Sequence, residues 1–261
     1  MAGPARTDPK RFAGLYGAIG WTLGNDPPYE VSVRKYLSLN PGVCDPDRIA
    51  GAKKAKAFLL EDLESDSNAV QEGERYRIDR DDGTQYISLT AINKSFAGSA
   101  KPEELRQTLW LATHQGHIVA KVTKKKPKTS TARDFADWYL GMDCTGFAAA
   151  FLGFSSPRSI GSYDQNPSQR RQAIKDVQPC DVLITKSDDG VYRHIAIVVS
   201  KTPQPPDAMA VFTAEATGEQ MDGGWMQGVV GNKKRVLKLE SAGIFVSAAK
   251  PGTEFYFYPM P

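Results

Sequence analysis

The chain has 261 residues, of which 41% are hydrophobic and 24% are charged. These proportions are typical of a globular protein with a sizeable core, and the length suits one large domain or two ordinary ones. The formal net charge is only +3, so the chain as a whole lacks the strong positive charge that favours binding to nucleic acid.

No stretch approaches the roughly 20 apolar residues that a membrane-spanning helix needs, so we predict no membrane span. Residues 1–24 lack the basic start, continuous apolar run and small-residue cleavage site of a secretory signal peptide. We therefore expect the chain to be made in the cytoplasm. Export by a dedicated machine and release by lysis both stay open.

The three cysteines, Cys44, Cys144 and Cys180, form no CxxC motif and no ligand cluster with histidine. Neither a structural zinc site nor any other metal site is predicted, and no cofactor is expected. Three cysteines cannot all pair within one chain, so at least one is a thiol. A Cys44–Cys180 disulfide is one alternative, and three buried thiols are the other.

The first half of the chain predicts a smaller α+β module over residues 1–125. Residues 45–67 repeat apolar side chains at helical spacing behind Asp45 or Asp47, either of which can cap a helix. Residues 75–89 predict a hairpin that turns at Asp82-Gly83, and residues 101–116 predict a second helix, opened by Pro102. No motif defines what this module does. Positioning a substrate, binding the cell wall, contacting an export partner and covering an active site are all open.

A polar, basic segment, Lys121–Asp134, reads as a connection between this module and a second domain over residues 126–261. It is either a solvated loop or a contact for an anionic polymer. Two short helices follow, at 132–141 and 144–154, and then a polar stretch. Strand-type runs close the chain, at 181–186, 194–200, 208–217, 235–240 and 254–260, and turn signals at Asp189-Gly190 and Gly223-Gly224 separate some of them. Helices followed by sequential strands predict an α+β domain with a mainly antiparallel sheet.

Cys144 begins the apolar run CTGFAAAFLGF directly after Asp143. Asp143 can cap the helix, and the free N–H groups and dipole of its first turn favour a thiolate there. Gly146 leaves room for a substrate or another element to come close. The pattern suits a nucleophile, although by itself it equally describes a buried core cysteine.

His194 stands at the start of a β-branched run in the second half, where it can act as the base that a thiol nucleophile needs. Glu215 lies one strand further on and can orient the imidazole, with Glu219 and Asp222 as rivals for this role. The other two histidines, His114 and His117, stand at a predicted helix end and are expected to be helix-terminal or surface residues.

The region from about Arg133 to the C-terminus resembles the NlpC-type (NlpC/p-sixty) cell-wall peptidases, which are papain-like cysteine enzymes. The family's Asp-Cys-Ser-Gly-Phe/Leu reads DCTGF here, its Pro-Gly-Asp before a strand reads PCD, and its His-led strand reads HIAIVV. A final strand with a polar residue before alanine reads FTAEAT. Thr145, Cys180 and Glu215 depart from the residues that are usual in the family.

The resemblance implies a papain-like domain whose nucleophile helix packs on the antiparallel sheet. It implies Cys144 as nucleophile, His194 as base and Glu215 as the orienting residue. The family's tyrosine near the oxyanion site lies well upstream of the nucleophile. Tyr139 is the candidate for this role, but it is only five residues before Cys144. The backbone N–H of Cys144 is the alternative donor to the oxyanion.

The implied activity is endopeptidase or amidase cleavage of the peptidoglycan stem peptide through a thioester, in the periplasm or cell wall. A delivered antibacterial effector with an immunity or inhibitor protein as partner, and a phage lysis or tail enzyme, are both consistent with this activity. A papain-like protease, deamidase or acyltransferase that acts on protein or lipid is an alternative. So is a non-catalytic binding module in which Cys144 is only buried.

Overall fold

The computed structural model describes residues 8–33, 35–38, 44–118, 131–220 and 226–260, with no side chains described at 218–220 and 226–230. The chain forms two compact units. The barrel unit comprises Met1–Gly14, Cys144–Thr217 and Val230–Pro261. The helical unit comprises Leu15–Asp143 and Gly218–Val229.

This division differs from the predicted boundary at residue 125 in two ways. Helix α5 (Ala132–Tyr139) packs on α2 (Pro46–Ser65) and so belongs to the helical unit. Helix α1 (Pro9–Leu15) begins in the barrel unit, because the Phe12 ring packs on Phe147 and Phe151 with centroid distances of 5.6 and 5.5 Å. The border between the units therefore falls at Asp143, directly before the predicted nucleophile.

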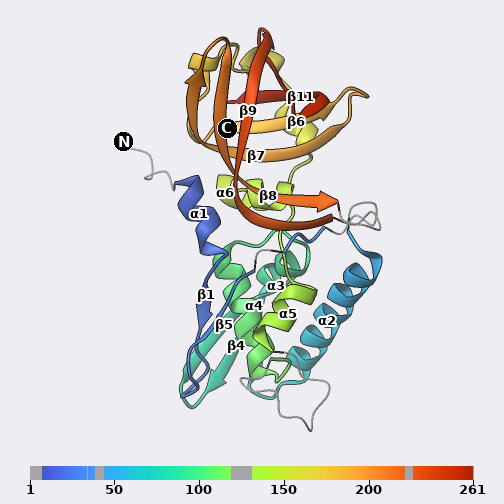
Figure 1. Cartoon of the computed structure of the whole chain (residues 1–261). Coiled ribbons are helices and arrows are strands. Elements are labelled where there is room, and N and C mark those ends of the chain that lie inside the picture. The colour runs from blue at the N-terminus through green and yellow to red at the C-terminus, as the bar shows by residue number, and fades with distance from the viewer. Residues whose placement is uncertain (1–7, 34, 39–43, 119–130, 221–225, 261) are drawn as a thin grey trace. The chain divides into compact units, whose positions relative to one another are not determined.

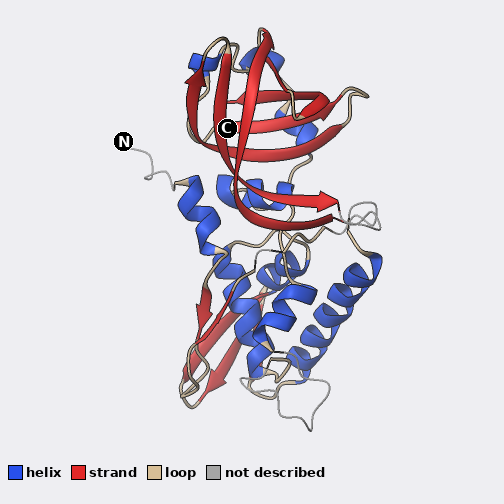
Figure 2. Ribbon diagram, viewed as in Figure 1, coloured by secondary structure: helices blue, strands red, loops and turns tan. Residues whose placement is uncertain are grey.

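Most elements predicted for the helical unit are confirmed. Asp45 caps α2, where its carboxylate accepts a hydrogen bond from the N–H of Asp47. The predicted hairpin is β4 (Arg75–Arg80) and β5 (Gly83–Ser88), and the predicted second helix is α4 (Pro102–His114). The elements that were not predicted are α1, β1 (Ile19–Trp21), β2 (Tyr29–Val31), β3 (Ala69–Glu72) and α3 (Leu89–Phe96). The helices α3 and α4 pack against β5, one of the two edge strands of the β3-β4-β5 sheet (Figure 2).

Six strands close into a barrel in the order β10-β11-β6-β7-β8-β9, and all but the end of β8 and the start of β9 belong to the barrel unit. Their bounds are Val182–Ser187 for β6, Tyr192–Gln204 for β7, Ala208–Gln220 for β8, Met226–Ser241 for β9, Ile244–Ser247 for β10 and Lys250–Tyr258 for β11. The strand pairs whose register is resolved are antiparallel. Helix α6 (Cys144–Leu152) packs beside β7 (Figure 1).

The short strand β10 was not predicted, and neither was the closure of the sheet into a barrel. Three 3-10 turns, Ile160–Tyr163, Pro167–Gln169 and Ile174–Asp176, lie in the polar stretch between α6 and β6. The sequence predicted no regular structure in that stretch. The barrel architecture neither establishes nor excludes a papain-like domain, so that assignment stays a proposal.

One face of the barrel strands carries an apolar core. Its fully buried members include Leu183, Ala196, Val198, Val211, Phe245, Phe255 and Phe257. Side chains alternate between the two faces of a strand, so His194 shares a face with Ala196 and Val198 on β7. Thr213 and Glu215 share a face with Val211 on β8, and Val198 pairs with Thr213. The candidate catalytic groups of these strands therefore line the same face as the apolar core.

Some predicted features lie outside the described residues. They include residues 121–130 of the basic segment, Asp222, the side chain of Glu219 and the Gly223-Gly224 turn. The hairpin turn at Asp189-Gly190 is confirmed, since Gly190 joins β6 to β7 with a φ of +80°. None of the described helices has both the length and the apolar character needed to cross a membrane.

Candidate active site

Cys144 is the first residue of α6, as the sequence predicted. Its side chain is buried, and so are Gly146, Phe147, Ala148, Ala149 and Ala150 of the same helix. The apolar side chains anchor the helix in the core, and the polar groups at its start are the backbone N–H groups of the first turn. This end is where backbone N–H groups have no partner within the helix and where negative charge is stabilised.

His194 lies on β7 opposite Thr185 of β6. Its Nε2 lies 2.8 Å from Oε2 of Glu215, and its ring is also hydrogen-bonded to the side chain of Cys144. Since Nε2 is engaged by the carboxylate, Nδ1 is the nitrogen left for the thiol. The imidazole thus bridges the Cys144 thiol and the carboxylate, which is the arrangement that a catalytic thiol–imidazole pair requires.

Glu215 is fully buried on β8 and has two cationic partners. Besides His194, the Nη2 atom of Arg235 donates to both carboxylate oxygens, at 2.9 and 2.8 Å. Nη1 of Arg235 donates to the Thr213 hydroxyl at 2.6 Å. The carboxylate is therefore held from one side by the imidazole and from the other by a guanidinium, whose own position is fixed by Thr213.

The electrostatics of this group follow from its burial and its neighbours. Burial alone would lower the pKa of His194, but the Glu215 carboxylate and the hydrogen bonds with Cys144 and Glu215 outweigh it and raise the pKa to about 9. Burial alone would raise the pKa of Glu215, but His194 and Arg235 bring it down to about 2. At neutral pH the site therefore holds an imidazolium paired with a carboxylate.

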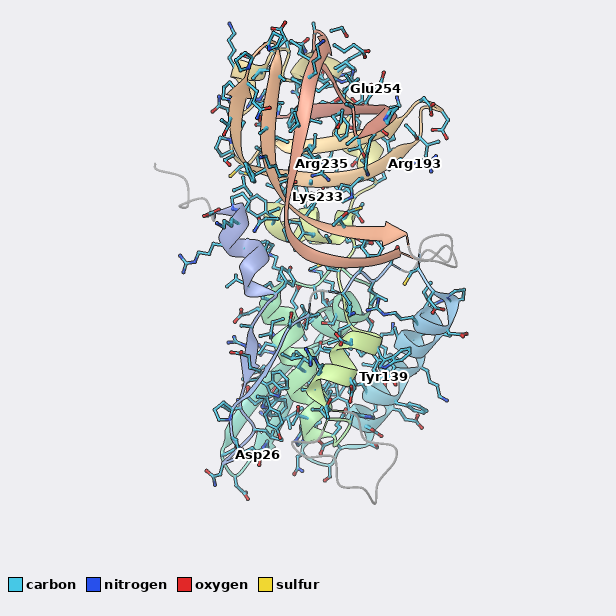
Figure 3. The ribbon with its side chains drawn as sticks, in the orientation of Figure 1. Asp26, Tyr139, Arg193, Lys233, Arg235 and Glu254 are labelled. Carbon is cyan, nitrogen blue, oxygen red and sulfur yellow. The ribbon has the colours of Figure 1, made fainter. Side chains whose placement is uncertain are left out.

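Arg235 is a site residue that the sequence analysis missed. It lies on β9 (Figure 3), and the region around it was recognised only as a strand. A signal for its role was present, because Arg235 is spaced by two and four residues from Leu237 and Leu239. Alternation along a strand places all three side chains on one face, so an arginine there faces inward and needs a buried carboxylate.

The two predicted residues before the nucleophile belong to the helical unit. Tyr139 ends α5, where its ring lies 5.2 Å from that of Phe135 and packs against Gly51. It also lines a hollow of 390 Å³ together with Phe58 and other side chains of that unit. This packing accounts for the ring without a catalytic task, and the oxyanion role of Tyr139 stays a prediction.

Asp143 directly precedes α6, and its backbone N–H donates to the carbonyl of Gly98 at 2.9 Å. Gly98 has a φ of +73°, and a Cβ atom there would lie 2.1 Å from the carbonyl oxygen of Leu37. Met142 exchanges backbone hydrogen bonds with Lys35 and Leu37 at 2.9 and 3.2 Å. The segment that leads to Cys144 is therefore firmly held within the helical unit. The capping role predicted for the Asp143 side chain stays a prediction.

Arg48 of α2 fixes the same segment from the side. Its guanidinium donates to the carbonyl of Leu140 at 2.9 Å and to the carbonyl of Tyr36. Tyr36 forms an isolated parallel bridge with Met142. This part of the helical unit thus fixes the backbone that leads to Cys144, a role that no sequence motif indicated.

The PCD motif forms the turn before β6. Cys180 has a φ of +69°, a region that favours glycine, which gives a physical reason for the glycine of the Pro-Gly-Asp motif that this segment resembles. Asp181 is buried and accepts two hydrogen bonds from Arg171, at 2.9 and 2.8 Å. The motif thus anchors β6, while its cysteine tolerates an unusual backbone conformation.

The remaining histidines and cysteines lie among groups that give them a structural role. His114 ends α4, as predicted, and both His114 and His117 lie 2.8 Å from aspartates of the helical unit, Asp66 and Asp62. All three cysteines are described and buried, and none of them forms a disulfide. Among the described side chains, no group of three or more potential ligands is arranged to hold a metal ion.

Comparison with known proteins adds no assignment. No protein-family model matches the chain, and neither a curated protein nor a solved structure matches it.

Proposed function

We propose that the protein is a cysteine hydrolase that cleaves amide bonds through a thioester intermediate. The observation that carries this proposal is the hydrogen-bonded series from Cys144 to His194 to Glu215, in which the imidazole contacts both the thiol and a buried carboxylate. A merely buried core cysteine has no need of such a partner. The raised pKa of His194 further favours an imidazolium that can stabilise a thiolate.

The chemistry follows from these positions. In the reactive state the proton of Cys144 already resides on His194, which is the imidazolium described above, and the thiolate attacks the amide carbonyl carbon to form a tetrahedral oxyanion. The C–N bond then breaks, His194 returns the proton to the leaving amine, and a thioester remains on Cys144. Water, deprotonated by His194, attacks the thioester, and the thiolate departs as the acid product is released.

Glu215 and Arg235 take part without touching the substrate. Glu215 keeps the ring of His194 in one orientation and stabilises its positive charge. Arg235 keeps Glu215 ionised in a buried position that would otherwise favour the neutral acid. The N–H of Cys144, at the start of α6, is the proposed donor to the oxyanion.

The proposed substrate is the stem peptide of peptidoglycan, and the proposed place of action is the cell wall. This part of the proposal rests on the resemblance of the DCTGF, PCD, HIAIVV and FTAEAT segments to NlpC-type peptidases. The catalytic group itself would serve equally well on a protein or lipid amide, so the substrate needs its own test.

The test uses purified sacculi incubated with the native protein and with Cys144→Ala, followed by mass spectrometry of the released fragments. We expect stem-peptide fragments from the native protein and none from Cys144→Ala. Cys44→Ala is the matched control, because Cys44 is a buried thiol in a small apolar cluster with Leu37 and Ile49. This control should release the same fragments as the native protein.

Equal release by Cys144→Ala would overturn the proposal. If sacculi are not cut, labelling by iodoacetamide near neutral pH separates the remaining cases. Selective alkylation of Cys144 would retain a cysteine hydrolase with another substrate. A Cys144 thiol no more reactive than Cys44 would exclude nucleophilic catalysis.

A further inference from the structure

A hollow of 710 Å³ lies in the barrel unit beside β9, β10 and the start of β11. Five positively charged residues lie in its lining: Lys233, Lys234, Arg235, Lys238 and Lys250. The only carboxylate of the lining is Glu240. The remaining wall is apolar and includes Val236, Val246, Pro251 and Phe255.

Three of the cations converge. Lys233 and Arg235, both labelled in Figure 3, are two residues apart on β9, so their side chains project from the same face of that strand. Lys250, at the start of β11, is near enough to both for their charges to act on it, and burial together with this repulsion lowers its pKa. Such a group of like charges raises the free energy of the folded protein, and a bound anion would relieve it.

Among the described side chains, the Glu215 carboxylate offsets part of this charge, since it acts on the pKa of Lys250 in the opposite direction. None of the four lysines lies within ion-pair distance of a described carboxylate, whereas Arg235 is engaged by Glu215. Glu215 in turn is shared with His194. The lysine ammonium groups are thus left as donors for a ligand, next to apolar walls that can hold its carbon skeleton.

We propose that this hollow binds an oxyanion, either a carboxylate or a phosphate, carried on a ligand with an apolar stem. Lys233 and Lys250 supply the charged donors, and the wall of Val246 and Pro251 contacts the stem. Arg235 borders the hollow and also holds Glu215, so the bound anion lies beside the catalytic group. Binding itself requires no catalysis, and it therefore tests separately from the proposed hydrolase activity.

The experiment is a titration of the full-length, ¹⁵N-labelled protein followed by amide chemical shifts at low ionic strength, where charges are screened least. Inorganic phosphate and glutarate are the two probes, each compared with chloride at equal ionic strength. We expect saturable shifts at residues 233–238 and 248–252 with at least one probe. Tighter binding of phosphate assigns a phosphate-bearing ligand, and tighter binding of glutarate assigns a carboxylate-bearing one.

Substitutions test whether the lysines cause the binding. Lys250→Met should weaken it about tenfold, the usual effect of losing one hydrogen bond to a charged group. Lys250→Arg should restore it. Lys10→Met is the matched control, because exposed Lys10 of α1 belongs to the same unit and its loss changes the net charge equally. Arg235 is left intact, since its removal would also strip Glu215 of a partner.

The inference is overturned if neither probe gives saturable shifts, or if Lys10→Met weakens binding as much as Lys250→Met. Cys144→Ala should bind the probes like the native protein. Binding without hydrolysis of any amide would leave the anion site standing and reject the proposed function. Hydrolysis of an amide without binding of either probe would reject the anion site and leave the proposed function standing.

Discussion

Replacing Glu215 with glutamine tests the electrostatic argument at its centre. Glutamine keeps the size of the side chain but removes the charge that holds the pKa of His194 at about 9 against a usual value of 6.5. That difference corresponds to about 3 kcal/mol of interaction between the imidazolium and its surroundings. Once the carboxylate is gone, burial is the largest remaining influence, so the pKa of His194 should fall to 6.5 or below.

The effect on the protonation state is large at ordinary pH. At pH 7.5 a group of pKa 9 is about 97% protonated, whereas a group of pKa 6.5 is only about 9% protonated. The assay is an NMR titration of the imidazole carbons, with the His194 signal assigned by its loss in His194→Asn. We expect a midpoint near 9 in the native protein and at or below 6.5 in Glu215→Gln.

The same substitution should alter stability in a pH-dependent manner. The raised pKa of His194 contributes stability that is complete below pH 6.5 and is lost as the pH rises through about 9. The lowered pKa of Glu215 contributes stability that is complete above pH 4.5 and is lost as the pH falls through about 2. In urea unfolding, the native protein should therefore exceed Glu215→Gln by about 3 kcal/mol between pH 4.5 and 6.5 and by less at pH 9.5.

The control is Glu240→Gln, which removes an exposed carboxylate of β9 from the same unit. Its His194 midpoint should stay close to that of the native protein. A midpoint that remains near 9 in Glu215→Gln would refute the reasoning, because another group would then have to stabilise the imidazolium. A stability difference that grows from pH 6.5 to 9.5 would contradict the assigned sign.

Three further substitutions test other parts of the structure by urea unfolding. Arg235→Met leaves Glu215 buried with one cationic partner fewer and should cost about 3 kcal/mol or more. Gly98→Ala should cost over about 3 kcal/mol, since its Cβ would meet a carbonyl oxygen at 2.1 Å, whereas Gly73→Ala, with open space and a φ of +65°, should cost about 1 kcal/mol. Cys180→Gly should change stability by under about 1 kcal/mol, because relief of a φ of +69° offsets a lost side chain, while Cys180→Val should cost more.

Each of these expectations has a result that contradicts it. An Arg235→Met protein as stable as the native one would mean that the guanidinium does not keep Glu215 ionised. Equal losses in Gly98→Ala and Gly73→Ala would show that the close approach to Leu37 is not tight. A large loss in Cys180→Gly, beyond that of Cys180→Val, would reverse the backbone argument.

Local pattern was sufficient for much of the secondary structure. The helix α2 with its Asp45 cap, the hairpin of β4 and β5, and the helices α4 and α6 follow from spacing, capping and turn residues that act within a few positions. Short elements such as β1, β2 and β10 were missed, because three or four residues carry too little pattern and depend on a partner strand.

The sequence by itself determined which residue types were available for the chemistry: a cysteine at a helix start, one histidine among strands and a carboxylate one strand on. The tertiary structure decided that these three meet, because hydrogen bonds between residues 144, 194 and 215 depend on how distant segments pack. It likewise decided that Arg235 pairs with Glu215, because strand alternation places the arginine inward but only packing brings it beside the buried carboxylate. It also decided that the strands close into a barrel, since closure depends on pairing between strands far apart in the chain.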